Sequence, residues 1–241
     1  MCAGLKAVID DAIHRVQALW DKNATMENWG LLLVDTKNAF NDINQVGMLW
    51  TVRHLWPSGP RFVFNCYCHL SSLVLRNRNG TASSLHSKEG VTRGDTLAMI
   101  AYGIVIIPLI KNLKREIPYV TQTWYAEDSR VLGVFARIET YFDPLTCQGP
   151  GRGYHPIPSK SVLIVRPENL EAGEYFGSHH GFKVCTGAGY LGNYIGDNNS
   201  KHDWLRERTL MWEKNINTIR ETTGKYPQES YKKLACTIQS E

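Results

Sequence analysis

Two apolar segments, far apart in the chain, each end on acidic side chains. Residues 31–34 run directly into Asp35, and residues 124–126 run into Glu127 and Asp128. A carboxylate at the end of a buried strand has to be paired or bound to a positive charge, because an isolated buried charge is very unfavourable. If the two strands were neighbours, divalent cations with hard oxygen ligands would offset the repulsion between the acids. Each acid taken singly is better explained as a helix cap or a salt-bridge partner.

The hydrophobic periodicity predicts alternating helices and strands, which indicates an α+β or α/β fold. Helices are predicted over residues 5–20, 39–55, 97–116, 136–147, 168–179 and 201–219. Strands are predicted over residues 29–34, 85–87, 121–125, 131–134 and 161–165, with a helix changing to a strand over residues 61–75. Residues 76–80 are typical of a hairpin turn, and residues 182–186 with 190–195 are predicted to form a final hairpin.

The composition is that of an ordinary globular protein inside a cell. Hydrophobic residues make up 43% and charged residues 21%, and the six cysteines are scattered without a disulfide or zinc pattern. The net charge of +4 permits an anionic partner without requiring one. The longest apolar stretch, residues 97–110, contains Pro108 and is too short to cross a bilayer. We therefore expect an intracellular protein, nuclear or cytoplasmic, without a membrane segment.

Five short motifs surround and follow these acids. They read Asp35-Thr36-Lys37-Asn38-Ala39-Phe40-Asn41, Glu-Gly-Val-Thr-Arg-Gly-Asp-Thr-Leu over residues 89–97, Tyr125-Ala126-Glu127-Asp128, Pro158-Ser159-Lys160-Ser161, and Tyr-Leu-Gly-Asn-Tyr-Ile-Gly over residues 190–196. In wording and order they resemble the motifs of retroelement reverse transcriptases of the non-LTR type, which are RNA-directed DNA polymerases. The resemblance covers roughly residues 30–196.

The resemblance implies an α+β polymerase palm, in which an antiparallel sheet carries the acids and helices back it. It also implies partial fingers and a rudimentary thumb. Residues 1–200 would form the fingers and palm. Residues 201–241 would form a helical C-terminal extension, either the start of a thumb or a connector.

The resemblance also assigns roles to individual residues. Asp35, Glu127 and Asp128 would be catalytic and would hold two Mg²⁺ or Mn²⁺ ions, with the backbone carbonyl of Thr36 as a further ligand. Lys160 would lie near the triphosphate and protonate the leaving pyrophosphate. The nucleotide-binding set would be Thr36, Lys37, Asn38, Ala39, Phe40, Arg93 and Gly94, and Leu191 with Gly192 would position the primer end.

Phe40 would select deoxynucleotides by clashing with a 2′-hydroxyl, although packing in the core is an equally simple role for it. The expected partners are an RNA or DNA template with a primer, deoxynucleoside triphosphates, and a second chain that supplies fingers or thumb. An RNA-dependent RNA polymerase is a rival assignment, and Phe40 argues against it because such an enzyme needs room for the 2′-hydroxyl.

Three positions depart from the family pattern. Glu127 stands where the family has aspartate, Arg93 where it has glutamine, and Thr96 where it has proline. The longer glutamate side chain moves its carboxylate outward, and a displacement of about 1 Å at a reacting centre can lower a rate roughly a hundredfold. Because the upstream fingers of the family would precede residue 28, the chain is expected to be a truncated, partly degenerate copy. The alternative function is therefore a catalytically inactive protein that binds nucleic acid or a partner.

Overall fold

The computed structural model describes residues 8–69, 71–77, 80–87, 89–91, 95, 97–223 and 225–234. Its centre is a five-stranded sheet in the order β4-β5-β1-β6-β7. The strands are β1 (Trp29–Val34), β4 (Thr121–Tyr125), β5 (Asp128–Val134), β6 (Val162–Val165) and β7 (Lys183–Cys185). The strands that carry the acids pair antiparallel, as predicted, whereas β7 pairs parallel with β6. The sheet is therefore mixed rather than purely antiparallel.

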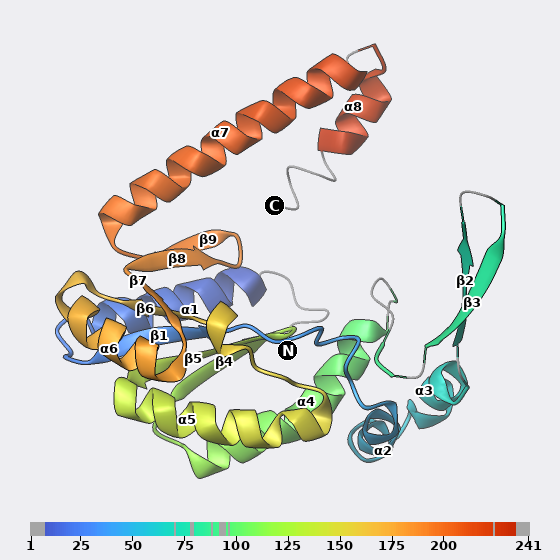
Figure 1. Cartoon of the computed structure of the whole chain (residues 1–241), viewed down its shortest axis with the longest axis horizontal. Coiled ribbons are helices and arrows are strands. Elements are labelled where there is room, and N and C mark those ends of the chain that lie inside the picture. The colour runs from blue at the N-terminus through green and yellow to red at the C-terminus, as the bar shows by residue number, and fades with distance from the viewer. Residues whose placement is uncertain are drawn as a thin grey trace.

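Helices cover the sheet on one face, and one helix with a small hairpin covers the other (Figure 1). The covered faces belong to two hydrophobic clusters: Leu32 and Val34 face α4 and α5, whereas Leu31 and Leu132 face α1 and the hairpin. The helices are α1 (Val8–Lys22), α4 (Ala98–Glu116), α5 (Phe135–Gln148) and α6 (Leu170–His180), and the hairpin strands are β8 (Gly187–Tyr190) and β9 (Asn193–Gly196). Burial on both faces explains why the strands read as continuous apolar runs.

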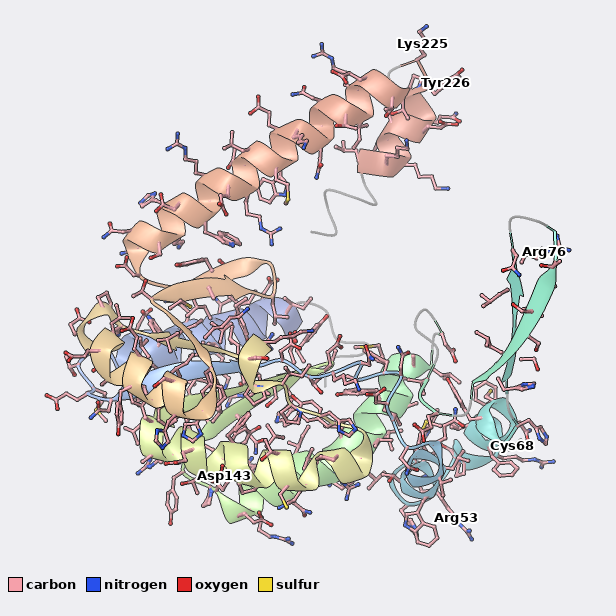
Figure 2. The ribbon with its side chains drawn as sticks, viewed as in Figure 1. Arg53, Cys68, Arg76, Asp143, Lys225 and Tyr226 are labelled. Atoms are coloured by element: carbon pink, nitrogen blue, oxygen red, sulfur yellow. The ribbon has the colours of Figure 1, made fainter. Side chains whose placement is uncertain are left out.

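Two arms extend from this body in Figure 1. The hairpin arm consists of β2 (Ser71–Arg76) and β3 (Ala82–Ser87), which follow α2 (Gln45–Leu55) and α3 (Pro60–Tyr67). The helical arm consists of α7 (Asn198–Thr223) and α8 (Pro227–Lys233). Figure 2 places Arg76 on the hairpin arm, and Lys225 and Tyr226 at the far end of the helical arm. Short 3₁₀ turns η1 (Pro150–Arg152), η2 (Pro158–Lys160) and η3 (Pro167–Asn169) complete the described chain.

Two sequence predictions of secondary structure were wrong. The helix predicted from residue 39 begins only at Gln45, because the Asn44 side chain accepts a hydrogen bond from Gly47 N at 2.8 Å and caps the helix there. The final hairpin is formed by β8 with β9, while residues 183–185 join the central sheet. The hydrophobic pattern marked these segments as strands, but it does not reveal which strand is the partner.

No helix among the described residues is long and apolar enough to span a membrane. The longest apolar helix, α4, instead lies in the core, where Tyr102, Leu109 and Leu113 are almost completely buried. The helix continues through Pro108. The domain boundary predicted at residue 200 stays a prediction, although the chain beyond it is helical through α7 and α8.

Candidate acidic site at the end of the sheet

Asp35 lies exposed directly after the last residue of β1. Its backbone is held by the segment that precedes β6: Asp35 N donates to Ser161 Oγ at 3.1 Å, and Ile157 N donates to the Asp35 carbonyl at 2.8 Å. Ser161 is itself buried and donates its hydroxyl to the Ile157 carbonyl at 2.8 Å. The strand end is thus fixed while the carboxylate remains open to solvent.

Glu127 and Asp128 lie at the tight turn between β4 and β5. Tyr125 pairs directly with Asp128, so that Ala126 and Glu127 form a two-residue connection. Ala126 adopts a positive φ of 49°, which is uncommon for a residue with a side chain. The acidic turn predicted from the sequence is therefore present, and Asp128 belongs to the strand rather than to the turn.

The register of the sheet brings Asp35 and Asp128 together. Val34 is opposite Ser129 in the antiparallel pair of β1 and β5, so Asp35 follows opposite Asp128. Side chains alternate along a strand, which places both acids on the face that carries α1 and the β8–β9 hairpin. Opposite residues in such a pair have Cβ atoms roughly 4.5–5.5 Å apart. Two distant stretches of sequence thus meet at one end of the sheet.

The electrostatics of Asp128 reflect this convergence. Partial burial raises the pKa of the Asp128 carboxyl above its usual value, the charges of Glu127 and Asp35 raise this pKa further, and Arg130 opposes the rise. The Arg130 guanidinium lies 3.2 Å from Asp128 Oδ2, with the arginine side chain 5% exposed and the aspartate side chain 50% exposed. A positive group of the protein itself therefore already neutralises part of the acid site.

The donor atoms suit a hard divalent cation, because Asp35 and Asp128 supply carboxylate oxygens from adjacent strands. The described part of the chain contains no group of three His, Cys, Asp or Glu residues placed to share a metal ion. Asp128 is moreover engaged by Arg130. The acid pair supplies the kind of oxygen atom that a divalent cation prefers, and the expectation of two ions with Glu127 as a ligand stays a prediction.

The segment after Asp35 divides into an exposed and a buried part. The exposed part is braced by the loop before β6: Thr36 Oγ1 donates to the His155 carbonyl at 3.0 Å, and Lys37 N donates to the same carbonyl at 2.9 Å. Asn38 has a positive φ of 41°, and its carbonyl accepts from the amides of residues 41 and 42. This turn directs Ala39 inward, where it is buried.

Phe40 is packed in the core. Its side chain is 8% exposed, and its ring lies 4.8 Å from that of Tyr102 on α4. The core-packing role considered from the sequence is therefore fulfilled. Its role as a gate against ribonucleotides stays a prediction.

Two further assigned elements are Lys160 and the turn between β8 and β9. Lys160 is exposed in η2, and Val162 shortly after it pairs with Leu33, so the lysine is near the same strand end as Asp35. Leu191 and Gly192 form the two-residue turn of the hairpin, with φ of 47° and 80°. Two consecutive positive φ values are typical of a tight type I′ turn, although leucine is unusual there. Their assigned roles at triphosphate and primer stay predictions.

Arg93 and Gly94, which the resemblance places at the nucleotide, lie outside the described residues, as does Thr96. The flanking residues are described. Gly90 N and Val91 N donate to the carbonyls of Ile43 and Phe40, which ties this loop to the segment after Asp35. Asp95 Oδ1 accepts from Leu97 N at 3.0 Å, so Asp95 holds the residue that directly precedes α4.

Sequence reasoning missed Arg130, the positive group of this site. The guanidinium carbon lies 4.1 Å from the centroid of the Tyr190 ring, so Arg130 connects the acid turn with the β8–β9 hairpin. The available signal was a basic residue at an inward position of an apolar strand, two residues after Asp128. Such a residue is buried only when it has a partner.

A hollow in the surface lies away from the acids. It has a volume of about 420 Å³ and lies between α2 and α3. Its lining is mainly apolar with two arginines: Val46, Leu49, Trp50, Arg53, Pro60, Arg61 and Phe64. None of the residues assigned to catalysis lines it, so the chemistry of the site is not explained by this hollow.

No protein-family model matches this chain, and no curated protein sequence matches it. Its structure is similar to solved structures of telomerase. The apo telomerase of Candida tropicalis gives a TM-score of 0.58 at 14% sequence identity, over 80% of this chain and 35% of that chain. Telomerase of Candida albicans in complex with a TWJ fragment of telomeric RNA gives 0.55 at 9% identity, over 80% of this chain and 34% of that chain.

The chain thus spans about a third of the length of these telomerases. At such low identity the likeness shows the fold and not the activity. The assignment to a retroelement of the non-LTR type stays a prediction. Telomerase is an enzyme related to reverse transcriptases, and the described residues include four of the five sequence motifs in full and part of the motif at residues 89–97. We conclude that this chain has a reverse-transcriptase-like fold.

Proposed function

We propose that this chain binds an RNA template with a primer and extends the primer with deoxynucleotides, as an RNA-directed DNA polymerase of a retroelement. The observation that carries the proposal is the cross-strand position of Asp35 and Asp128 on one face of a reverse-transcriptase-like fold. Two of the similar telomerases are complexes with a fragment of telomeric RNA, which supports RNA as the partner. The net charge of +4 is compatible with a phosphate backbone.

In this proposal the residues around the acid pair have separate roles. A divalent cation held by Asp35 and Asp128 would supply positive charge to the phosphate that is transferred. Lys160, exposed at the same strand end, would contact the triphosphate and hold a proton for its leaving group. The Leu191–Gly192 turn lies on the hairpin that covers this face of the sheet, and would position the primer end.

A second candidate function is non-catalytic binding of nucleic acid. The ion pair of Arg130 with Asp128 favours it, because an acid that is already paired is a weaker ligand for a cation. The glutamate at position 127 favours it as well, since its carboxylate extends farther than that of aspartate. In this case the chain would retain an RNA-binding surface but would have lost the ability to catalyse nucleotide transfer.

The test combines primer extension with RNA binding. The chain is incubated with a labelled DNA primer annealed to an RNA template, deoxynucleotides and Mg²⁺ or Mn²⁺, and binding of the same duplex is measured by fluorescence anisotropy. Asp35→Asn and Asp128→Asn should each lower extension about a hundredfold or more, with binding changed less than about threefold. Asp143→Asn is the matched control, because this exposed acid lies on α5 (Figure 2), and α5 packs on the other face of the sheet from the acid pair.

Each outcome separates the two candidates. Extension by the parent chain that persists in both variants would refute the assignment of the acid pair. Binding without extension would select the second candidate, and then Glu127→Asp combined with Arg93→Gln should restore extension if these two departures caused the loss. Absence of duplex binding in the parent chain would refute both candidates.

A further inference from the structure

Arg130 is a buried cation in the middle of the central sheet. It lies on β5, is 4% exposed, and pairs across the sheet with Leu33 on one side and Thr123 on the other. Because side chains alternate along a strand, the Arg130 side chain lies on the same face of the sheet as those of Asp128 and Leu132. Arginine keeps its proton in proteins, so this position carries a permanent positive charge. Moving such a charge out of water is very unfavourable without compensating partners.

Two partners hold the guanidinium at the acid site. Arg130 Nη2 donates to Asp128 Oδ2 at 3.2 Å, and the guanidinium carbon lies 4.1 Å from the centre of the Tyr190 ring. Tyr190 is itself 2% exposed and ends β8, next to the Leu191–Gly192 turn. The arginine therefore joins the acid pair to the hairpin that covers it.

The pairing of Arg130 is incomplete. Its Nη1 atom is buried and has no hydrogen-bond partner among the described residues. The same arginine faces an acid whose neighbours, Asp35 and Glu127, carry further negative charge. A buried guanidinium that keeps an unused hydrogen-bond donor beside several carboxylates has the geometry of a counter-ion. In a purely structural ion pair, by contrast, all donors of the arginine would be hydrogen-bonded.

We propose that Arg130 is an internal counter-cation of the acidic site, which competes with a divalent cation for Asp128 and thereby weakens divalent-cation binding. The proposal deepens the proposed function, because it rests on the same acid pair being the cation site. Arg130 acts as a positioning residue: it contacts Asp128 and the hairpin, and not the reacting atoms. It accounts for a site in which carboxylates converge and yet are partly neutralised by the protein.

The test is a measurement of Mn²⁺ affinity for the full chain without nucleic acid, by electron paramagnetic resonance of the free ion. Arg130→Leu should raise the Mn²⁺ affinity about tenfold, because it removes a unit charge a few ångströms from the site. Arg130→Gln should raise it similarly, and it keeps a polar side chain in case the leucine variant folds poorly. Arg130→Lys keeps the charge and should leave the affinity within about threefold of the parent.

Arg137 provides the matched control. Its guanidinium also lies over a tyrosine ring, that of Tyr119 at 5.5 Å, but on α5 and outside the acid site. Arg137→Leu removes the same charge from the chain and should leave Mn²⁺ binding unchanged. If it raises the affinity as much as Arg130→Leu does, net charge explains the effect and the proposal is wrong.

A double-mutant cycle tests whether Arg130 acts through Asp128. In an Asp128→Asn background, replacing Arg130 by leucine should change the Mn²⁺ affinity less than threefold. An equal rise in both backgrounds would contradict competition for Asp128, and so would unchanged affinity in both Arg130→Leu and Arg130→Gln with native circular dichroism.

These measurements need neither primer nor template, so they can fail independently of the proposed function. A parent chain that neither binds nor extends the duplex would refute the proposed function, whereas the Mn²⁺ affinities would still decide the role of Arg130. Conversely, a parent chain that extends primers and shows no response of Mn²⁺ affinity to Arg130 would leave only the present inference refuted.

Discussion

The central sheet and the two arms of this molecule are stabilised in different ways. Adjacent residues Leu31 and Leu32 of β1 are both fully buried, one on each face of the sheet. In the arms, by contrast, large apolar side chains are open to solvent: Val74 on the hairpin arm is 68% exposed, and Leu210 on the helical arm is 57% exposed. Both arms extend away from the body in Figure 1.

The difference indicates how the acid site is built. The position of Asp35 relative to Asp128 follows from strand register, which the core fixes on both faces. Among the described residues the arms have no comparable core of their own, and α7 contacts the rest of the chain mainly through β8, β9 and α8. We therefore expect the acid pair to be held at the full stability of the body, and the arms to open at a much lower free energy.

The largest expected effect tests this contrast with two leucines. Leu32→Ala should lower the free energy of unfolding by about 2–5 kcal/mol, because it removes a fully buried side chain and leaves a cavity. Leu210→Ala should change this free energy by less than about 0.5 kcal/mol, because the side chain is already exposed. Urea unfolding followed by circular dichroism measures both. A loss for Leu210→Ala as large as that for Leu32→Ala would show that the helical arm is packed as firmly as the sheet.

A smaller effect is expected where the hairpin arm is anchored to the body. Tyr67, the last residue of α3, donates its hydroxyl to Asp95 Oδ2 at 2.6 Å, and Asp95 Oδ1 accepts from Leu97 N just before α4. Tyr67→Phe should lower the free energy of unfolding by about 1 kcal/mol at pH 7. This is less than a buried hydrogen bond to a charged group contributes, because Asp95 is partly exposed to solvent.

The effect should depend on pH with a defined sign. The hydrogen bond from Tyr67, followed by that from Leu97 N, lowers the pKa of Asp95 in the folded chain. Because the folded pKa lies below the unfolded value of about 4, this stabilisation is present above that pH and is lost as the pH falls through the folded value. The difference between parent and Tyr67→Phe should therefore shrink in acid. Tyr226→Phe, at an exposed position of the helical arm, should show no difference at either pH.

The convergence of the acids was predictable from the sequence, whereas their neutralisation was not. Apolar runs ending at Asp35 and Glu127-Asp128 predicted two strand ends, and the motif order predicted that they meet. Hydrophobic periodicity located β1, β4 and α4 within one or two residues because these elements have buried, regular faces. Hydrophobic periodicity therefore identified the helices and strands that are stabilised by packing in the core.

What sequence reasoning missed depends on contacts between distant residues. The parallel pairing of β7 with β6 and the ring of Tyr190 over Arg130 join residues that no local pattern connects. The late start of α2 had a local signal, the capping residue Asn44, but the apolar residues Ala39 and Phe40 before it imitated a helical stripe. In the structure these two side chains are buried from a turn instead of a helix.

The smallest expected effect concerns strain at the acid turn itself. Ala126 has a φ of 49°, a conformation that is unfavourable by roughly 1–2 kcal/mol for a residue with a Cβ atom, and the paired strands on either side impose it. Ala126→Gly should relieve this strain, partly offset by the greater freedom of glycine in the unfolded chain, and raise the free energy of unfolding by about 0.5 kcal/mol. Ala172→Gly in α6 should have the opposite sign, a loss of about 1 kcal/mol, because that backbone is helical. If both variants lowered the free energy of unfolding equally, the turn would not be strained. The rigidity assigned to the body would then not extend to the turn that contains Glu127 and precedes Asp128.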